Sequence, residues 1–482
     1  MRTYKNRGKG GAIGARASFV CYVTILIFTV GAARADTITV GLGVGYDFNN
    51  IQAGINDAND GDEVIVADGT YTGPGNRNID FIGKDIIVRS ENGALNCIID
   101  VNASPQDWHN NGFYLHRGEK KTSVIQGFTI TGGYTYKGGG IYCNSSSPTI
   151  KNCVITDNVC SFGGGIACED NSNATISNCT IIGNIGDDAG GGIYCRQSNI
   201  TVKNCTIIGN IVDDRSGGGI FCYGSDITVT NCTFADNSAP RGDFLACGYT
   251  NSIPSYVQIS NCVIWDGGDE IQNNDGSEIV IIYSDVRRGY LGKGNIDLDP
   301  CFVEPGYWDA NGTELEPWDD FWVEGDYHLL EGSPCIDTGD PNYVPAPDET
   351  DLDGKSRVIS GRIDMGAYEY QPPVEAKMKL TPQTLNCNSK GNWITCHIWL
   401  PEEYSVSEID PDSILLEQRV PAEWTWFNEK QNEAMAKFNR SKLSSILEEG
   451  NVELTVSCHL LDGTYFEGKD TIRVIGKGNK NK

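Results

Sequence analysis

The sequence predicts an all-β protein in which a parallel β-helix solenoid is followed by a small C-terminal β-sandwich. The solenoid prediction rests on two columns of cysteine whose members recur every 25 to 30 residues or so, which is about the length of one solenoid coil. The first column is Cys143, Cys168, Cys195, Cys222 and Cys247, and the second is Cys153, Cys179, Cys205, Cys232 and Cys262. A residue that recurs once per coil occupies the same place on every turn, so each column stacks along the solenoid axis.

Apolar residues repeat at fixed distances from the second cysteine column. They stand three residues before it, at Ile150, Ile176, Val202, Val229 and Ile259, and two residues after it, at Ile155, Ile181, Ile207, Phe234 and Ile264. Polar residues separate them, which is the alternation of a half-buried strand. Strand alternation that repeats from coil to coil predicts apolar columns that point inward.

Two asparagine columns mark the turns between these strands. One precedes the second cysteines, at Asn152, Asn178, Asn204, Asn231 and Asn261, and the other follows at Asn158, Asn184, Asn210 and Asn237. Asparagine tolerates a left-handed backbone, and its amide can donate a hydrogen bond along the stack. We therefore predict that both columns are structural ladders and not a ligand site.

The first 35 residues have the pattern of a secretory signal peptide. A basic start is followed by the apolar run 19–30 and by Ala33-Arg34-Ala35, a small-x-small cleavage site. Cleavage there would make Asp36 the first residue of a secreted or cell-surface protein. The alternative is an uncleaved anchor helix, for which the apolar run is short. No later stretch is long and apolar enough to span a membrane.

The composition argues against binding through a net positive charge. Loss of the signal removes six basic residues and no acidic ones, which takes the formal net charge from −27 to −33. Such a chain will not bind nucleic acid or an anionic membrane surface through its net charge.

Export permits disulfides, yet we predict that the column cysteines are reduced thiols packed as small apolar groups. In-register neighbours on stacked strands lie about 4.8 Å apart, whereas a disulfide needs Cβ atoms about 3.8 Å apart. Disulfides between coils remain the alternative. Outside the columns, Cys301 and Cys335 are a better candidate pair.

The coils resemble those of known families. The motifs Gly-Gly-Gly-Ile and Ile/Phe-x-x-Asn, the latter as in 234–237, are similar to polymorphic outer-membrane protein repeats and to other pectin-lyase-like right-handed β-helices. The stretch 46–71 is similar to the N-terminal cap and first coil of that superfamily. This resemblance covers about residues 38–290 and implies a right-handed β-helix, which the sequence places at 36–290. It implies no single activity, because the fold carries lyases, hydrolases, adhesins and inert surface proteins.

Three further segments follow the coils. Residues 291–370, which end in Asp364-Met365-Gly366-Ala367-Tyr368-Glu369-Tyr370, resemble the choice-of-anchor-type closing segment of secreted β-helix proteins. A solenoid needs such a cover over its apolar last coil. Residues 371–376 are predicted to be a linker, 377–475 an accessory β-sandwich with one short helix at 441–447, and 476–482 a basic tail.

Candidate functional residues lie in the loops that enter the Gly-Gly-Gly strands. Asp187, Asp188, Asp213 and Asp214 would bring four carboxylates together, one coil apart, and calcium would relieve their repulsion. In polysaccharide lyases of this fold, calcium often bridges an acidic sugar to the protein, and an Arg would then act as the base. Arg215 and Arg241 are the candidates for that base. The alternative is that the acids are solvated and that Arg215 pairs with Asp213 or Asp188.

Aromatic residues occupy corresponding outward positions in three coils, at Tyr142, Tyr194 and Phe221. They could form a platform on which sugars stack, or they could stack on one another and stabilise the sheet. A second metal candidate is Asp351 with Asp353, which resembles the start of a calcium loop but has Arg362 where the bidentate Glu belongs. An ordinary acidic turn is the alternative there.

These observations leave three functional hypotheses. The first is a non-catalytic protein that binds extracellular polysaccharide or another surface, because the sequence contains no convincing acid and base pair. The second is a calcium-assisted polysaccharide lyase that acts on uronic-acid polymers. The third is an adhesin-like or structural surface protein.

Overall fold

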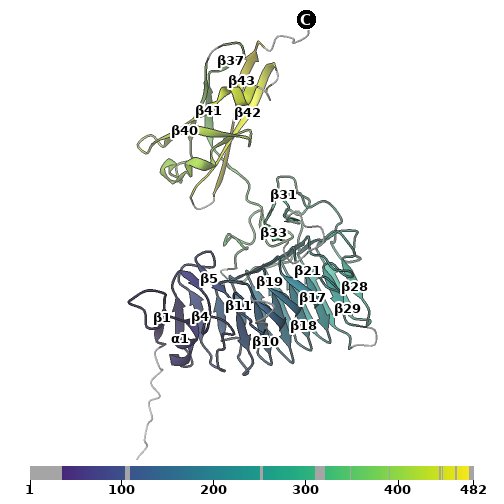
Figure 1. Ribbon diagram of the computed structural model, residues 1–482. Coiled ribbons are helices and arrows are strands. Elements are labelled where there is room, and N and C mark those ends of the chain that lie inside the picture. Colours follow the sequence, from purple (N-terminus) through teal and green to yellow (C-terminus); the bar gives the residue numbers. More distant parts are fainter. Residues whose placement is uncertain are drawn as a thin grey trace, which may run out of the picture.

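The computed structural model describes residues 35–476 except 104–108, 250–252, 310–320, 348, 390, 445–446, 448 and 462–463. Almost all of the predicted signal peptide (1–35) and basic tail (476–482) lies outside these residues. A parallel β-solenoid and a separate C-terminal β-domain make up the described chain (Figure 1). None of the described helices has the length and apolar character needed to cross a membrane.

Parallel strands from successive coils form the sheets of the solenoid. The ten-stranded sheet contains β1 (Thr37–Val40), β2 (Glu63–Val66), β4 (Ile87–Ser90), β7 (Val124–Gln126), β11 (Thr149–Lys151), β15 (Thr175–Ser177), β19 (Ile200–Lys203), β23 (Asp226–Thr230), β26 (Tyr256–Ser260) and β29 (Glu278–Ile282). The nine-stranded sheet contains β3 (Gly69–Tyr71), β5 (Cys97–Asp100), β8 (Thr129–Thr131), β12 (Val154–Thr156), β16 (Thr180–Ile182), β20 (Thr206–Ile208), β24 (Thr233–Ala235), β27 (Val263–Trp265) and β30 (Asp285–Val286).

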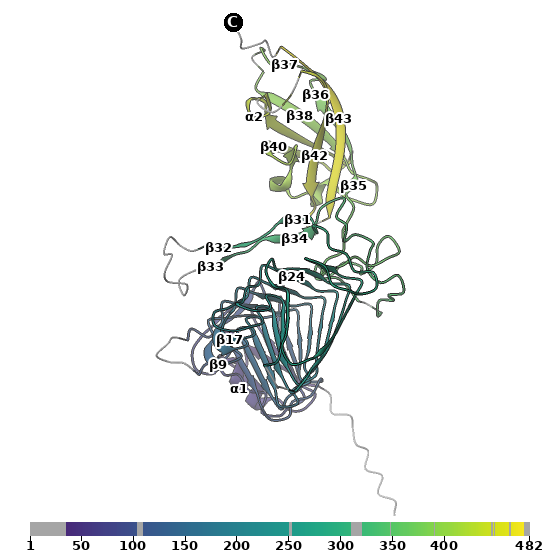
Figure 2. The ribbon, with the colours of Figure 1, turned by 90° about the vertical axis from the view of Figure 1, so that its right-hand side faces the viewer.

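Two further parallel sheets complete the coils. The seven-stranded sheet contains β6 (Phe113–Leu115), β10 (Ile141–Asn144), β14 (Ile166–Glu169), β18 (Ile193–Arg196), β22 (Ile220–Tyr223), β25 (Leu245–Cys247) and β28 (Ile271–Asn273). The four-stranded sheet contains β9 (Tyr134–Lys137), β13 (Val159–Phe162), β17 (Ile185–Ala189) and β21 (Ile211–Val212). The predicted parallel β-helix is confirmed, and Figure 2 shows its stacked coils from the side of the last ones.

The solenoid core consists of the predicted inward columns. Every column cysteine is at most 1 % exposed and packs with the isoleucine and valine columns in one continuous cluster. Strand register aligns them, for example Cys168 with Cys195 on β14 and β18. All described cysteines are free thiols in the structure, Cys301 and Cys335 included, so the candidate disulfide between those two is not formed. Cys335 instead lies 3.3 Å from a carboxylate oxygen of Asp285.

The asparagine columns shape the turns as predicted. Members of the first column adopt left-handed backbone with φ between 51° and 54°, at Asn152, Asn178, Asn204, Asn231 and Asn261. The second column is a buried amide ladder. In it, Asn184 Nδ2 donates to Asn210 Oδ1 at 2.9 Å and to the carbonyl oxygen of Ile155 at 2.9 Å. Each amide thereby satisfies backbone groups that the bend between two strands leaves without a sheet partner.

A short helix, α1 (Ile51–Asp57), covers the first coil. Asn50 caps it by accepting a hydrogen bond from Ala53 N at 2.9 Å. Ile51 and Ile55 are fully buried and belong to the solenoid core. The helix therefore shields the apolar end of the stack, as the resemblance at 46–71 implies.

Residues 291–370, here called the closing segment, differ from the expected cap. Asn295 does bind the last coil, donating to the carbonyl oxygen of Ile281 at 2.9 Å. Most of the segment instead packs along the outside of the nine-stranded sheet, where it buries the outward residues Ile182, Ile208 and Val263. Its strands are β31 (Phe302–Glu304), β32 (Tyr307–Asp309), β33 (Phe321–Val323) and β34 (Asp326–Leu329), which form two antiparallel pairs (Figure 2).

The reason for this placement is visible in the strands of the nine-stranded sheet. In β16 and β20 two isoleucines follow one another, so one of each pair points outward and would otherwise meet water. Trp322 of β33 lies against Gly209, where an added Cβ would come within 2.5 Å of the indole ring. Trp308 Nε1 donates to the Gly209 carbonyl oxygen at 3.0 Å. The closing segment therefore covers a side of the solenoid as well as its end.

The C-terminal domain is one mixed sheet wrapped around its own core. Its strands, in spatial order, are β35 (Val374–Glu375), β43 (Tyr465–Ile475), β42 (Gly450–His459), β39 (Leu415–Leu416), β40 (Val420–Asn428), β41 (Glu433–Asn439), β38 (Trp393–Trp399) and β36 (Lys377–Thr381), with β37 (Thr384–Asn386) beside β43. Short helices are η2 (Val406–Glu408), η3 (Pro411–Ser413) and α2 (Arg440–Ser444). Strands β35 and β37 run parallel to β43, so the predicted sandwich is mixed rather than purely antiparallel.

Candidate functional site

The outer face of the seven-stranded sheet carries the aromatic residues that the sequence singled out. Because the column cysteines point inward, the residues on either side of each cysteine point outward. One outward row is Tyr142, Ala167, Tyr194 and Phe221, and the next is Asn144, Glu169, Arg196 and Tyr223. The four-stranded sheet lies next to these rows along the chain and supplies the acidic loops. This face is the candidate functional site.

The predicted aromatic platform is only partly accessible. Tyr194 is 5 % exposed and Phe221 is fully buried, because Phe162 of β13 and Tyr249, which follows β25, pack over them. Phe162 lies 5.2 Å from Tyr194, the rings of Tyr194 and Phe221 stack at 5.4 Å, and Tyr249 lies 5.2 Å from Phe221. Sugar stacking on Tyr194 or Phe221 is therefore ruled out in this conformation, and the two rings serve packing.

Tyr142 is half-buried and differs from the other two rings. It stacks in parallel on Tyr114, with ring centroids 5.1 Å apart, and Tyr114 stacks on the exposed His116 at 4.3 Å. Tyr114 thus covers one face of the Tyr142 ring. The Tyr142 hydroxyl takes part in a polar network. Tyr142 is better placed to recognise a ligand by hydrogen bonds than by stacking.

The centre of that network is Glu169, which the sequence analysis did not identify. Its side chain is 1 % exposed, although it stands on the outer face of β14. Lys137 Nζ forms a short ion pair with Oε2, the Tyr142 hydroxyl donates to the same oxygen at 2.8 Å, and Arg196 Nη1 lies 3.6 Å from Oε1. Oε1 accepts no hydrogen bond, so one oxygen of a buried carboxylate has only the Arg196 charge nearby.

The network extends to the half-buried residues around Glu169. Asn144 Nδ2 donates to the Tyr142 hydroxyl at 3.0 Å, and the Arg196 guanidinium lies 5.9 Å from the Tyr223 ring centre. A buried carboxylate that holds two cations and a hydroxyl keeps those groups in one geometry at the surface. The side chains of Arg196, Tyr142 and Asn144 are partly exposed and therefore available to a ligand.

Signals for Glu169 were present in the sequence. The residue follows a column cysteine directly, which places it on the outer face, and Lys137 stands at the opening of the preceding Gly-Gly-Gly strand. What the sequence did not show is that the bend between β9 and β10 brings Lys137 back over β14. That contact depends on loop shape and not on the repeat.

The four predicted metal-ligating acids lie beside this network but do not converge. Asp188 is held by Arg215, whose Nε lies 3.0 Å from Oδ1, which is one of the pairings that the sequence left open. Burial, and then the nearby Asp213 carboxylate, raises the pKa of Asp187 above its ordinary value. Burial and Asp214 do the same to the pKa of Asp213. Among the described residues, no three His, Cys, Asp or Glu side chains form a group that could hold a metal ion, and calcium here stays a prediction.

The two candidate bases are both exposed. Arg215 is engaged with Asp188, and its guanidinium lies 6.0 Å from the Tyr249 ring centre. Arg241 lies one coil further on, where its carbonyl oxygen accepts a hydrogen bond from Gly217 N at 3.0 Å. A base must lose its proton, and ion pairing with Asp188 opposes that for Arg215. A catalytic role for either residue stays a prediction.

The second metal candidate has the geometry of an acidic turn. Asp351 is fully buried, and its two carboxylate oxygens accept from Lys355 N at 2.8 Å and from Glu369 N at 3.0 Å. Asp353 is bound instead by His328, with Nε2 at 2.9 Å. The two acids are therefore committed to different protein partners.

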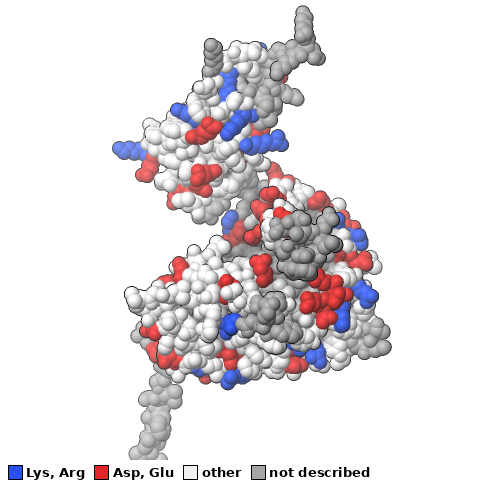
Figure 3. All heavy atoms as spheres, in the orientation of Figure 1, with Lys and Arg blue, Asp and Glu red and all other residues white. Residues whose placement is uncertain are grey.

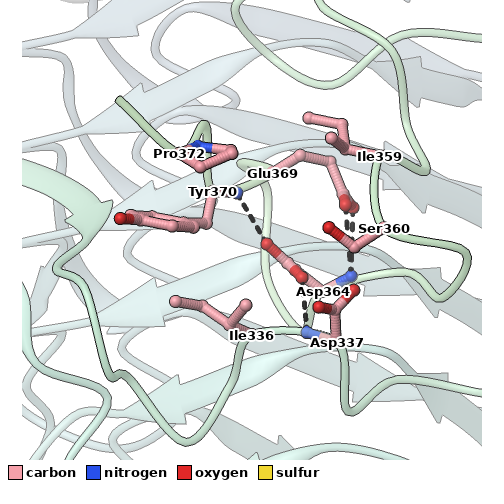
Figure 4. A pocket seen from close by; sticks show the side chains of 8 residues that line it. All are labelled: Ile336, Asp337, Ile359, Ser360, Asp364, Glu369, Tyr370 and Pro372. Atoms are coloured by element: carbon pink, nitrogen blue, oxygen red, sulfur yellow. Dashed lines mark hydrogen bonds between the residues drawn. The ribbon is translucent and has the colours of Figure 1, made fainter. Parts of the chain in front are cut away.

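Two cavities lie in the second half of the described chain. One of about 120 Å³ in the closing segment is lined by Asp364 and Glu369 (Figure 4). As Figure 4 shows, Asp364 accepts from Asp337 N and Tyr370 N, both at 2.6 Å, and Asp364 N donates to Glu369. These carboxylates organise the backbone of the segment, so we assign this cavity no ligand.

The other cavity, of about 360 Å³, lies beside the last coils. Glu270 lines it, and burial raises the pKa of Glu270 to about 7. Arg287 and Arg288 also line it, and Arg288 Nη1 lies 3.5 Å from Asp269. No sequence pattern pointed to this cavity, because it lies where the repeat ends.

Comparisons with known proteins agree with the fold. Residues 85–253 and 191–298 match the family described as right-handed β-helix region. A search of curated proteins found no match. Among solved structures, the chain is similar to the pectate lyase Pel9A at 15 % identity and a TM-score of 0.39, covering 71 % of this chain and 98 % of that one.

Two further solved structures resemble the chain. One is a pectin methylesterase mutant in complex with a hexasaccharide, at 11 % identity and a TM-score of 0.35, covering 54 % of this chain and 92 % of that one. The other is pectin methylesterase from carrot, at 12 % identity and a TM-score of 0.31, covering 54 % and 83 %. At such identities and scores these likenesses carry no argument about activity.

Proposed function

We propose that the solenoid is a secreted or cell-surface protein that binds extracellular polysaccharide without cleaving it, through the outer face of the seven-stranded sheet. The observation that carries the proposal is the buried Glu169, which holds Lys137, Tyr142 and Arg196 in one arrangement. Side chains that are held in place before binding lose little conformational entropy when a ligand arrives. Guanidinium, hydroxyl and amide groups at one surface suit the hydroxyl groups of sugars.

The absence of cleavage is supported by the state of one candidate base, Arg215. A lyase needs a base beside the sugar carboxylate, and the Arg215 guanidinium is paired with Asp188. The calcium-assisted lyase remains the alternative, with Asp187 and Asp213 as its metal ligands. The third hypothesis, an adhesin-like or structural surface protein, predicts no affinity for any free glycan.

Affinity electrophoresis of the full chain in gels that contain one polysaccharide each tests the proposal. The panel contains polygalacturonate, alginate and hyaluronan with neutral xylan and galactan. We expect retardation by at least one of them and a loss of about tenfold in affinity, or about 1.4 kcal/mol, in Arg196→Gln. Arg288→Gln, which removes an exposed arginine elsewhere, is the matched control. Retardation that Arg196→Gln leaves unchanged would place binding elsewhere, and no retardation by any polymer would favour the structural hypothesis.

A further inference from the structure

The outer face of one half of the C-terminal sheet carries an unusual set of side chains. Alternation in β38 and β41 sends Ile394, Cys396, Ile398, Ala434, Ala436 and Phe438 into the core. The intervening residues point to the other side. That side also receives the outward residues of β36 and β40, and we call it the tryptophan face.

Four tryptophans stand on the tryptophan face. Trp393 and Trp399 come from β38, and Trp424 and Trp426 come from β40, with β41 between the two strands. Trp393, Trp424 and Trp426 are each 42 to 43 % exposed, although tryptophan is the side chain with most to gain from burial. Strands β38 and β40 are separated by two strand spacings, or about 10 Å, and successive outward residues by about 7 Å. Rings at these spacings cover an area the size of several sugar units.

Lysines accompany the rings. Lys437 Nζ lies 4.3 Å from the Trp424 ring centre, and Lys377 Nζ lies 5.6 Å from that of Trp399. Lys379 is a further exposed lysine on β36. The acids within these four strands each have a protein partner: Glu423 pairs with Lys442 at 3.1 Å, and Glu433 is hydrogen-bonded to His397 at 2.8 Å. The face is therefore basic in a chain whose net charge is −27.

This charge is the opposite of that of the rest of the chain and defines the partner. Figure 3 shows Lys and Arg side chains on the C-terminal domain, together with Asp and Glu side chains. An ammonium group over an indole ring is oriented and still partly solvated, so it can pair with an anion that a ligand brings. Aromatic faces bind the apolar faces of sugar rings, and lysines bind carboxylate or sulfate groups.

We propose that the tryptophan face binds an anionic polysaccharide, with Trp424 and Trp426 stacking on sugar rings and Lys437, Lys377 and Lys379 pairing with its carboxylate or sulfate groups. The inference goes beyond the function proposed for the solenoid, because it uses other residues on a separate core. The protein would then hold glycan at two places. A second copy of the chain is the competing occupant of an exposed aromatic face.

Three polymers with one backbone test the charge and the stacking separately. The full chain is run in gels that contain neutral dextran, carboxymethyl dextran or dextran sulfate. We expect retardation by one or both charged polymers and much less by dextran. The polymer that retards more identifies the anionic group. Equal retardation by all three would overturn the charge argument, and no retardation by any would overturn the proposal.

Variants locate the site. Trp424→Ala with Trp426→Ala should weaken binding about tenfold, which corresponds to about 1.4 kcal/mol. Lys437→Gln, which keeps both rings, should weaken it about threefold and reduce its salt dependence. Tyr307→Ala, which removes an aromatic ring 57 % exposed in the closing segment, is the matched control and should change nothing. Unchanged binding in both site variants would overturn the proposal.

Two further measurements test whether the variants act through misfolding and whether a second copy of the chain covers the tryptophan face. Quenching of tryptophan fluorescence by iodide should fall when dextran sulfate or carboxymethyl dextran is added to the unmodified chain. This measurement does not depend on whether any variant folds. Elution of the chain as a dimer that Trp424→Ala with Trp426→Ala converts to a monomer would show that a second copy covers the face, and would overturn the proposal. Arg196→Gln should leave this binding intact, so the failure of one site is distinguishable from the failure of the other.

Discussion

The solenoid and the closing segment stabilise their interiors in opposite ways. Along the asparagine columns, the polar groups buried in the solenoid are neutral and repeat once per coil, as in the ladder of Asn184 and Asn210. Most buried polar groups in the closing segment are ionisable and occur once. Arg357 is fully buried, and its guanidinium donates to the carbonyl oxygens of Gly366 and Ala367 and lies 3.5 Å from Glu369. In the coils, weak contacts between neutral groups recur on every turn, and their contributions to stability add up. The closing segment occurs once, so its stability depends on a few strong contacts.

Removal of the Arg357 charge should give the largest effect. Arg357→Met leaves two carbonyl oxygens and the buried Glu369 without their partner, and such losses cost about 3–5 kcal/mol. We expect the closing segment to detach while the coils stay folded, which hydrogen exchange of 351–370 against the coil strands will show. Arg362→Met, a partly buried arginine of the same segment, is the control. Equal protection in the variant and the unmodified chain would mean that the charge does not hold the segment.

Interruption of the asparagine ladder should give the next largest effect. Asn184→Ala removes three donated and two accepted hydrogen bonds at a buried position. Each unsatisfied buried group costs about 1–3 kcal/mol, of which water entry recovers part, so we expect about 3 kcal/mol in urea unfolding. Asn199→Ala, on an exposed turn of the next coil, should cost well under 1 kcal/mol or so. Equal losses at both positions would show that the ladder is not what stabilises the stack.

The stability of the closing segment should depend more strongly on pH than the stability of the coils. Burial raises the pKa of Glu369 to about 8 and that of Asp364 to about 6. Burial lowers the pKa of His328, but Asp326 and Asp353 outweigh it and raise the pKa to about 9. A raised folded-state pKa stabilises the fold at low pH, for acid and histidine alike, and that stability is lost as pH rises through the folded value.

Protection of the closing segment should therefore decrease between about pH 5 and pH 9, by about 1–2 kcal/mol, whereas protection of β16 and β20, which flank the neutral asparagine ladder, should stay level. Hydrogen exchange at several pH values, corrected for the intrinsic rate, measures both regions in one sample. Glu369→Gln should flatten the part of this dependence near pH 8. A decrease of the same size in the coils would contradict the contrast between charged and neutral interiors.

The loops that carry Asp187 and Asp213 contain charged groups, as the closing segment does, but these groups are more exposed to solvent. Changes there should have the smallest effect on stability. Calcium between Asp187 and Asp213 would remove their repulsion. At about five times its dissociation constant calcium should add about 1 kcal/mol of stability. Asp187→Asn with Asp213→Asn should abolish that gain, and Asp351→Asn should leave it. A gain that survives the double variant but disappears in Asp351→Asn would assign calcium to the closing segment.

The sequence predicted the features that recur in every coil, and it did not predict the residues whose role occurs only once in the chain. Columns of Cys, Ile and Asn identify the coil, its inward positions and its left-handed turns, because every coil faces the same packing problem. Glu169, Arg357 and Glu270 each have one position and no column, so only the folded chain shows what surrounds them. The sequence left open whether the outward rings of Tyr194 and Phe221 bind sugars or stack on one another, because the residues that cover them, Phe162 and Tyr249, belong to no column.

We propose that the outer face of the seven-stranded sheet binds polysaccharide and leaves it intact. The most direct test incubates the full chain, with calcium, with the polymer that retards it most, and measures the length of that polymer by size-exclusion chromatography and its ultraviolet absorbance. We predict an unchanged polymer length, no unsaturated product, and binding that Arg196→Gln weakens. Shortening of the polymer that disappears in Arg215→Gln or Arg241→Gln would contradict the claim and identify a lyase.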